Sequence, residues 1–231
     1  VKILSEQFGV SEMTIRRDLH LLEEQGYATI HYGGASLLDR QNIGCQSFSL
    51  RKGKELENKR KIAKKAASFI KEGDVLFMDT STTVLEILTY MPAFRVKIIT
   101  NSVPVMETVY RDENIDLYMA PGLYRSLGGP LDYATAEYLS RFHYNKAFFG
   151  SNSYDPVFGA SAAEEIEAAV KKCVLGNSDE NYLLVDHSKM GKRSFVKYAD
   201  TVDYTGILSD EELDIDWRTK IIQNGGSLIL C

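Results

Sequence analysis

Long apolar runs, paired cysteines and a secretion leader are all absent from the sequence. No apolar run approaches the roughly 18–20 residues that a helix needs to span a bilayer, so we expect no membrane partner. The chain does not open on a basic segment followed by an apolar one and a cleavage site. Cys45, Cys173 and Cys231 are odd in number and widely spaced, which argues against a disulfide framework and a zinc site. These absences predict a cytoplasmic protein with no bound metal.

Two nucleotide-binding motifs are absent as well. The sequence has neither GxGxxG nor a glycine-rich loop that ends in a phosphate-binding lysine, so we expect neither ATP nor NAD and predict no cofactor. Internal repeats and low-complexity tracts are also absent. The 231 residues are 44% hydrophobic, which is typical of a globular protein. That length suits one large domain, or a small domain followed by a medium one.

The charge balance argues only weakly about partners. A net charge of −5 is unusual for a nucleic-acid-binding protein. Between Arg40 and Lys71, however, basic residues outnumber acidic ones, which are limited to Glu55 and Glu57. This segment creates a local positive field, or it is a solvated linker and helix face; the sequence leaves both interpretations open.

The first residues predict two helices joined by a short turn. Apolar residues recur at helical spacing over residues 1–8, and Gly9 ends that helix. Ser11 is a suitable N-cap for a second helix over Glu12–Gln25, with Gly26 as its C-terminal stop. The second helix has two distinct faces: Ile15, Leu19 and Leu22 form the inward stripe, and Met13, Arg16, Arg17 and His20 lie opposite.

This arrangement is typical of a helix-turn-helix, whose second helix enters the major groove of DNA. Residues 27–38 predict a β-hairpin wing beside it. An αα-hairpin followed by a turn, with no role in DNA binding, is the alternative. The candidates to read base edges are Glu12, Met13 and Arg17, those for phosphate contacts are Ser11, Thr14 and Arg16, and those near the tip of the wing are His31 and Tyr32.

The string LSEQFGVSEMTIRRDLHLLEEQGYATIHYGGASL resembles the winged helix-turn-helix of the DeoR family of bacterial transcription regulators. The resemblance rests on the T-I-R-R-D-L core and the terminal G-G-A, and it implies double-stranded operator DNA as a partner. Family members usually carry a further helix before this point, whereas this chain begins at Val1, inside what would be the second helix. We therefore expect an incomplete DNA-binding domain that binds DNA less well than a version with that helix.

Residues 39–57 are polar and lack periodicity, so we expect a linker between a domain of residues 1–38 and a domain of residues 58–231. In the second domain helices and strands alternate. Helices are predicted over 58–71, 82–90, 104–111, 134–142, 162–176 and 214–224, and strands over 75–79, 96–100, 115–120, 146–150, 182–186 and 205–208. Repeated βα units predict an α/β fold with a mostly parallel sheet and helices on both faces.

Small polar residues follow the predicted strands. The first strand is followed by DTSTT, Asp79–Thr83, which opens a helix. Hydroxyls and free N–H groups at a helix N-terminus form an anion site, with a plain N-cap as the alternative. Later strands end in TNS, APG, GSNS and DHSKMG, the last with a cation, Lys189. Because ligands of open α/β sheets bind at the carboxyl ends of strands, we expect a polyhydroxylated anion there.

The resemblance to the DeoR family continues over this domain, on Asp79–Thr83, T-N-S, K-A-F-F-G and D-H-S-K. It implies a sensor domain similar to ribose-5-phosphate isomerase that binds a phosphorylated sugar as effector. By that resemblance the site contains Asp79, the phosphate is held by Ser81, Thr82 and Thr83, and the sugar is lined by Asn101, Ser102, Gly122, Asn152 and Lys189. Ser81 replaces the family's usual glycine. FFGSN and LLVDHSKMGK are most similar to the lactose phosphotransferase repressor branch.

A sugar-phosphate isomerase is the alternative function. Its proton transfer needs a positioned carboxylate. The segment after the fourth strand offers only Asp155. Asp79 and Asp186 are the other possible bases, but each lies at a strand end, where orienting loop amides is the alternative role. We therefore expect no catalysis, and instead a repressor of a sugar-metabolism operon. In it a homodimer or homotetramer sets the reading helices at the spacing of operator half-sites, and the effector shifts the oligomer between two states.

Overall fold

The computed structural model describes residues 1–24, 28–31, 34–37, 48–125 and 128–231. The chain divides into two compact units, Val1–Lys54 and Glu55–Cys231. No helix in these described ranges is both long and apolar enough to cross a bilayer.

The first unit begins with two helices and a hairpin. Helix α1 (Lys2–Phe8) ends at Gly9, whose φ of 67° lies in the left-handed region that glycine adopts freely. Helix α2 (Glu12–Glu24) follows, and strands β1 (Ala28–His31) and β2 (Gly34–Leu37) pair antiparallel. The two predicted helices and the predicted hairpin are confirmed. The expected stop at Gly26 lies outside the described residues, as does Tyr32.

Burial separates the faces of α2 less cleanly than the sequence predicts. Ile15 is 6% exposed and Leu19 is half-buried, as expected for the inward stripe. Leu22, predicted on the same stripe, is 39% exposed, so its assignment to the core is wrong. Helix α1 contains no buried residue, and Ile3 and Phe8 are exposed. Ile15 is therefore the residue of this stripe that the structure buries fully.

A short helix, α3 (Phe48–Lys52), lies inside the segment predicted to be linker. Its Phe48 is buried. The surrounding polar composition masks a helix of five residues, because so short an element shows no full period of apolar positions.

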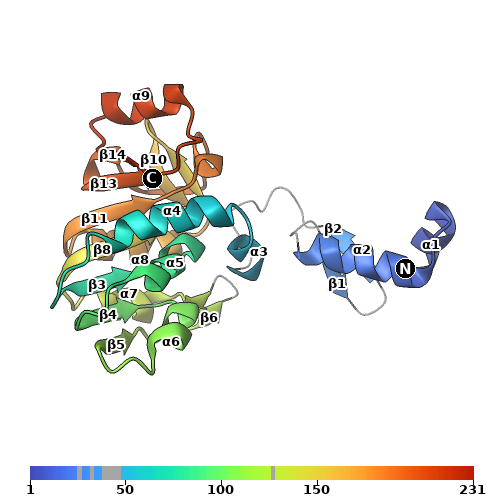
Figure 1. The fold of residues 1–231 in the computed structure, drawn as a ribbon, viewed down its shortest axis with the longest axis horizontal. Helices are drawn as coiled ribbons and strands as arrows, with labels where there is room; N and C mark the ends of the chain where they lie inside the picture. The colour runs from blue at the N-terminus through green and yellow to red at the C-terminus, as the bar shows by residue number, and fades with distance from the viewer. Residues whose placement is uncertain (25–27, 32–33, 38–47, 126–127) are drawn as a thin grey trace. The chain divides into compact units, whose positions relative to one another are not determined.

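The second unit is built on a seven-stranded sheet, all of whose pairings are parallel. The strand order is β14-β13-β11-β8-β3-β4-β5 (Figure 1). The strands are β3 (Val75–Met78), β4 (Val96–Thr100), β5 (Ile115–Met119), β8 (Tyr144–Gly150), β11 (Ser178–Leu184), β13 (Gly206–Ser209) and β14 (Leu228–Leu230). The helices are α4 (Leu56–Ala67), α5 (Thr82–Tyr90), α6 (Val103–Val109), α7 (Tyr133–Leu139), α8 (Glu165–Leu175) and α9 (Ile215–Gln223).

Adjacent residues of the central strand β8 show why both faces are covered. Side chains alternate along a strand, so Phe148 and Phe149 point to opposite faces. Phe148 stacks on Tyr182, which stacks on Phe69 just after α4. Phe149 contacts Phe77 in the core cluster that also holds Ala168, Val170 and Val174 of α8. The predicted α/β fold with a parallel sheet and helices on both faces is therefore confirmed.

A second, three-stranded sheet was not predicted. Strands β9 (Ser153–Asp155), β10 (Gly159–Ala162) and β12 (Val196–Ala199) pair antiparallel in the order β12-β10-β9. As a consequence α8 begins at Glu165, and the predicted start at Ala162 is wrong because that residue belongs to β10. Strands β6 (Tyr124–Arg125) and β7 (Gly129–Pro130) form a further short pair. Two 3-10 turns, η2 (His187–Lys189) and η3 (Thr201–Asp203), complete the unit.

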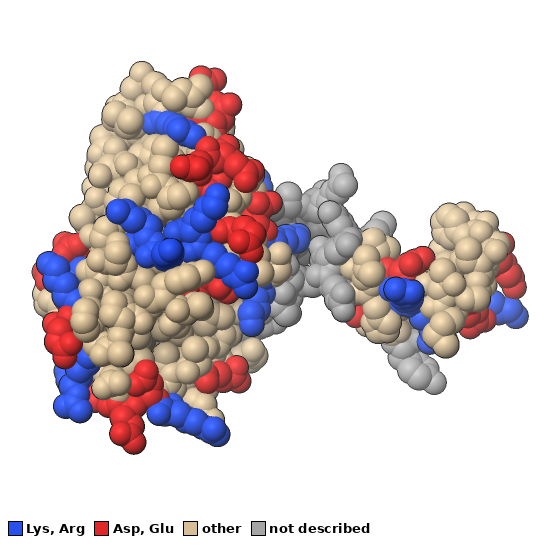
Figure 2. All heavy atoms as spheres, viewed as in Figure 1, with Lys and Arg blue, Asp and Glu red and all other residues tan. Residues whose placement is uncertain are grey.

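The basic segment noted in the sequence falls largely on one helix. Lys and Arg side chains gather over α4 in Figure 2. Arg60, Lys61, Lys64 and Lys65 are exposed, whereas Lys59 is buried. Arg60 is paired with Glu57 at 2.8 Å and lies 3.7 Å from Glu86. The outer face of α4 is thus a solvated basic surface, partly neutralised by its neighbours.

Candidate nucleic-acid interface and effector site

The N-terminus of α2 presents most of the predicted DNA contacts together. Ser11 caps the helix, since its Oγ accepts a hydrogen bond of 3.1 Å from the N–H of Thr14, as predicted. The Oγ atoms of Ser11 and Thr14 lie 2.9 Å apart. Six candidates therefore lie within the first turns of one helix and are all exposed: Ser11, Glu12, Met13, Thr14, Arg16 and Arg17.

Two interactions hold parts of this surface. The guanidinium of Arg16 lies 3.9 Å from the carboxylate of Glu12, one turn earlier in the helix. Both side chains are exposed, so the pair contributes little to stability. On the hairpin, His31 Nε2 lies 2.8 Å from Ser36 Oγ on the paired strand. Met13 is an apolar side chain, yet it is 76% exposed among the described residues. Base edges such as the thymine methyl are suitable contacts for it.

At the carboxyl end of β3, Asp79 is bound by the protein itself. Its Oδ2 accepts a hydrogen bond of 3.0 Å from the N–H of Gly150, and its Oδ1 accepts one of 2.8 Å from Thr80 N–H. The ammonium of Lys171, on α8, contacts the same Oδ2 and donates to the carbonyl of Gly150 at 2.9 Å. Asp79 thus joins β3, β8 and α8, and its carboxylate is already paired.

Lys171, which pairs with the candidate site residue Asp79, is not among the residues predicted from the sequence. Burial lowers the pKa of its ammonium. Attraction to Asp79, Tyr198 and Glu167 raises the pKa by more than burial lowers it, so the net pKa lies above the ordinary value. The side chain is therefore a buried cation. The available signal was its position on α8: three residues after Ala168 and three before Val174, Lys171 occupies the buried stripe of the helix.

Ser81 acts as the cap of α5. Its Oγ accepts hydrogen bonds from the N–H groups of Thr83 at 3.2 Å and Val84 at 3.4 Å. A side chain at Gly150 would place its Cβ 2.1 Å from that oxygen, so the hydroxyl of Ser81 fills the space beside Gly150. Thr82 and Thr83 are buried. The plain N-cap is therefore present, and a phosphate at this loop remains a proposal.

Asn101 combines deep burial with an unused hydrogen-bond acceptor. At the end of β4 it is 1% exposed, and its Nδ2 donates to the carbonyl of Pro130 at 3.1 Å. Its Oδ1 has no partner among the described residues. Next to it, Ser102 caps α6 by accepting from Val105 N–H at 3.4 Å. Because a buried polar atom without a partner is costly, Asn101 Oδ1 is the atom here that most favours a ligand donor.

The remaining predicted effector residues have different surroundings. Gly122 has φ 139°, and a Cβ there would lie 2.3 Å from Thr135 Oγ1 and 2.6 Å from Asp132 Oδ1, so packing against the cap of α7 requires the glycine. Asn152 is half-buried between β8 and β9. Lys189 Nζ donates to Ser188 Oγ at 3.1 Å and lies 3.8 Å from Asp186.

An open cavity of about 530 Å³ is lined by residues at the N-termini of α7 and α8. Its lining includes none of the predicted effector residues, and no motif or periodic pattern in the sequence points to it. The lining residues are Leu131, Asp132, Tyr133, Ala163, Glu164, Glu165, Ile166 and Phe195.

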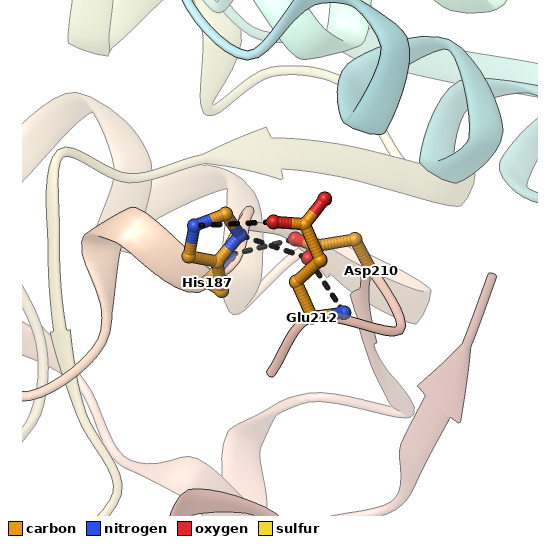
Figure 3. A group of neighbouring side chains, drawn as sticks. All are labelled: His187, Asp210 and Glu212. Atoms are coloured by element: carbon orange, nitrogen blue, oxygen red, sulfur yellow. Dashed lines mark hydrogen bonds and ion pairs between the residues drawn. The ribbon is translucent and has the colours of Figure 1, made fainter. Parts of the chain in front are cut away.

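One cluster of metal-binding residue types occurs among the described residues. His187, Asp210 and Glu212 place ligand atoms within 4.8 Å of one another (Figure 3). Hydrogen bonds already occupy several of these atoms. His187 Nδ1 lies 2.9 Å from Asp210 Oδ1, His187 N–H donates to Asp210 Oδ2 at 2.7 Å, and Asn58 Nδ2 donates to Glu212 at 3.1 Å. We describe this group as a hydrogen-bonded clasp around the turn η2.

Burial lowers the pKa of His187, but its hydrogen bond and attraction to Asp210, with the charges of Glu55 and Asp186, raise it. The net pKa lies above the ordinary value of 6.5. Asp210 and Asp186 are buried, whereas Glu212 is exposed. The clasp therefore favours a protonated imidazole between carboxylates.

Comparisons with known proteins identify both units. Residues 1–41 match the model of the DeoR-like helix-turn-helix domain, and residues 54–211 match that of the DeoR C terminal sensor domain. The chain is also similar to ribose 5-phosphate isomerase A from Methanocaldococcus jannaschii, with 21% identity and a TM-score of 0.43, over 58% of this chain and 54% of that chain.

Relatives of similar length share about a third of their residues with this chain. The HTH-type transcriptional regulator YulB of Bacillus subtilis is 33% identical, over 93% of this chain and 83% of its own length. A lactose phosphotransferase system repressor of Staphylococcus epidermidis is 32% identical, over 94% of this chain and 86% of its own. The HTH-type transcriptional regulator GlpR of Haloferax volcanii is 32% identical, over 99% and 90%. The chain belongs to the DeoR family of transcriptional regulators, a family of non-enzymatic proteins.

Proposed function

We propose that this regulator is a repressor of a sugar-metabolism operon and that a phosphorylated sugar controls its binding to operator DNA. The observation that carries the effector proposal is the unpartnered Oδ1 of Asn101, 1% exposed at the carboxyl end of β4. A sugar hydroxyl is a donor that satisfies such an acceptor. Relatives that bear the name lactose phosphotransferase system repressor support a sugar-related operon.

Two groups are suited to the anionic end of such a ligand. The N-terminus of α5 offers the positive end of a helix dipole, with Ser81, Thr82 and Thr83 around it. Lys189 brings a cation on the turn η2, and its side chain is 21% exposed. We propose that the phosphate binds the α5 terminus and that Lys189 contacts the ligand from the other side. Asp79 positions the loop through its bonds to Gly150 and Lys171 and does not touch the ligand.

We further propose that Glu12, Met13 and Arg17 read base edges and that Ser11, Thr14 and Arg16 contact phosphates, with His31 and Tyr32 on the wing. A homodimer or homotetramer would place two such helices on successive half-sites. The effector can change DNA binding only if its affinity differs between two states of the oligomer.

A panel of sugar phosphates in a thermal-shift assay tests the effector class, because a ligand that binds only the native state raises the melting temperature. We expect one member to stabilise the protein and to change operator affinity in a gel-shift assay. Lys189→Ala should weaken that ligand and abolish induction while operator affinity without ligand stays unchanged. Normal induction of Lys189→Ala would contradict the assignment of this lysine, and a panel without any stabilising member would contradict the effector class.

A further inference from the structure

The cavity between α7 and α8 combines aromatic walls with carboxylates. Tyr133 is 77% exposed and Phe195 is 78% exposed, although both carry large apolar rings. Leu131 and Ile166 add apolar surface, and acidic side chains complete the lining: Asp132, Glu164 and Glu165. Small-molecule sites typically pair aromatic walls with a few polar groups that fix orientation.

The charge of this lining decides what it can accept. It includes three carboxylates and no lysine or arginine. Asp132 is committed to the protein, because its oxygens accept from Leu123 N–H at 2.7 Å and Thr135 N–H at 2.9 Å. Those bonds hold the pKa of Asp132 below its ordinary value, so it stays ionised. A phosphate is therefore repelled here, whereas hydroxyl groups find carboxylate acceptors.

Both walls of the cavity continue from predicted effector segments. Asn101 donates to the carbonyl of Pro130, the residue before Leu131. On the other side, Ser161 Oγ accepts from Ser194 N–H at 2.8 Å, and Ser194 precedes Phe195. Ser161 also lies within 3.5 Å of the carbonyl of Ser153, next to Asn152. Each wall is thus joined, through a backbone neighbour and a hydrogen bond, to a segment predicted to bind the effector.

We infer that the cavity is the subsite for the uncharged, hydroxylated part of the effector, with Tyr133 and Phe195 stacking on the sugar and Glu165 accepting its hydroxyls. This inference rests on the proposed function, since it divides one ligand between two places. The sugar lies between α7 and α8, and the phosphate lies outside this acidic lining. The residues that select one sugar from another are then Tyr133, Glu165 and Phe195, none of which belongs to the strand-end motifs.

The test compares ligands that differ in their sugar part. Titration calorimetry of the wild type, Tyr133→Ala and Phe195→Ala would use glucose 6-phosphate, fructose 1-phosphate, fructose 6-phosphate, glycerol 3-phosphate and inorganic phosphate. Tyr110→Ala is the control, because Tyr110 is also exposed but follows the C-terminus of α6 and is not among the residues that line the cavity. We expect each cavity variant to weaken the binding of the best sugar phosphate by about three- to tenfold, the scale of a lost aromatic stacking contact. The affinity of each variant for inorganic phosphate should stay within twofold of the wild-type affinity, which corresponds to about 0.4 kcal/mol.

The outcomes separate this inference from the proposed function. A sugar phosphate that binds the wild type and both cavity variants equally overturns the subsite and leaves the proposed function standing. An equal loss for inorganic phosphate and sugar phosphate also overturns it, because the aromatic rings would then support the whole site rather than the sugar. If no phosphorylated sugar binds the wild type, both proposals fail. Glu165→Gln should reduce the preference for the sugar phosphate over inorganic phosphate while the melting temperature stays that of the wild type. An unchanged preference would show that Glu165 is not part of the subsite.

Discussion

The ammonium of Lys171 on α8 contacts the carboxylate of Asp79 at the end of β3, and both side chains are at most 5% exposed. The carbonyl of Gly150 accepts from the same ammonium, and the N–H of Gly150 donates to the same carboxylate. One residue of β8 thus completes a closed set of hydrogen bonds between a cation and an anion. A buried pair of this kind is costly to break, because either partner alone is left as an uncompensated charge.

We expect Lys171→Met to reduce the free energy of unfolding by about 3–5 kcal/mol, the range for removal of one partner from a buried pair. Asp79→Asn should cost a similar amount. The double variant should recover most of the loss, because two neutral side chains need no charge compensation. Urea denaturation followed by circular dichroism measures all three. Losses that simply add in the double variant would show that the two side chains do not act as a pair.

Gly150 and Ser81 form a second testable pair. A Cβ at position 150 would lie 2.1 Å from Ser81 Oγ, closer than any real contact. We expect Gly150→Ala to lower the free energy of unfolding by about 1–3 kcal/mol, as overpacking does. Ser81→Gly in the same chain should relieve part of that loss by removing the hydroxymethyl group. A Gly150→Ala variant as stable as the wild type would contradict this packing.

The pKa of His187 predicts how stability depends on pH. The pKa in the folded state is raised, so the contribution of His187 is fully present below the unfolded value of about 6.5 and is lost as pH rises through the folded value. We expect the difference in unfolding free energy between wild type and His187→Gln to shrink over that window. Urea unfolding at pH 5.5, 6.5, 7.5 and 8.5, about one unit apart, measures it. A difference that grows with pH would reverse the sign and contradict the raised pKa.

Arg17 and Arg16 should affect DNA binding differently if their proposed roles are correct. Arg17→Ala is expected to cost about 1–3 kcal/mol on the best operator and to relax specificity at one base pair. Arg16→Ala should weaken all sequences alike and reduce the salt slope by about 1. Fluorescence anisotropy with an operator selected from a random duplex library, at several salt concentrations, separates the two. Equal effects of Arg17→Ala on operator and non-operator duplexes would remove it from base reading.

Much of the fold was predictable because its main elements are locally encoded. The apolar runs of β3, β4 and β8 alternate with amphipathic helices, and that order alone predicts a parallel sheet. The small sheet of β9, β10 and β12 was not predictable in this way. Its strands, SYD, GASA and VKYA, have only three or four residues each, so they are too short to show the alternation over four to eight residues on which strand prediction depends.

The candidate site residues that follow strands in the sequence were predictable, whereas those brought together only by the fold were not. Ser81, Asn101 and Ser102 could be proposed from the sequence because they closely follow strands β3 and β4. Lys171 was not found, because its partner Asp79 lies 92 residues earlier and only the fold brings them together. Tyr133 and Phe195 carry no motif, and their common cavity depends on how α7 and α8 pack against each other.

The hydrogen bonds of Asp79 hold the candidate ligand loop at the N-terminus of α5 in place. Thr80, the residue between this carboxylate and Ser81, donates its own N–H to Asp79, so the loop is anchored before any ligand arrives. A ligand that binds an anchored loop pays little conformational entropy, which favours affinity at a given number of contacts. A loop with so little freedom is also unsuited to fold around its ligand. If the proposed effector binds there, we therefore expect it to act by displacing whole helices rather than by refolding the loop.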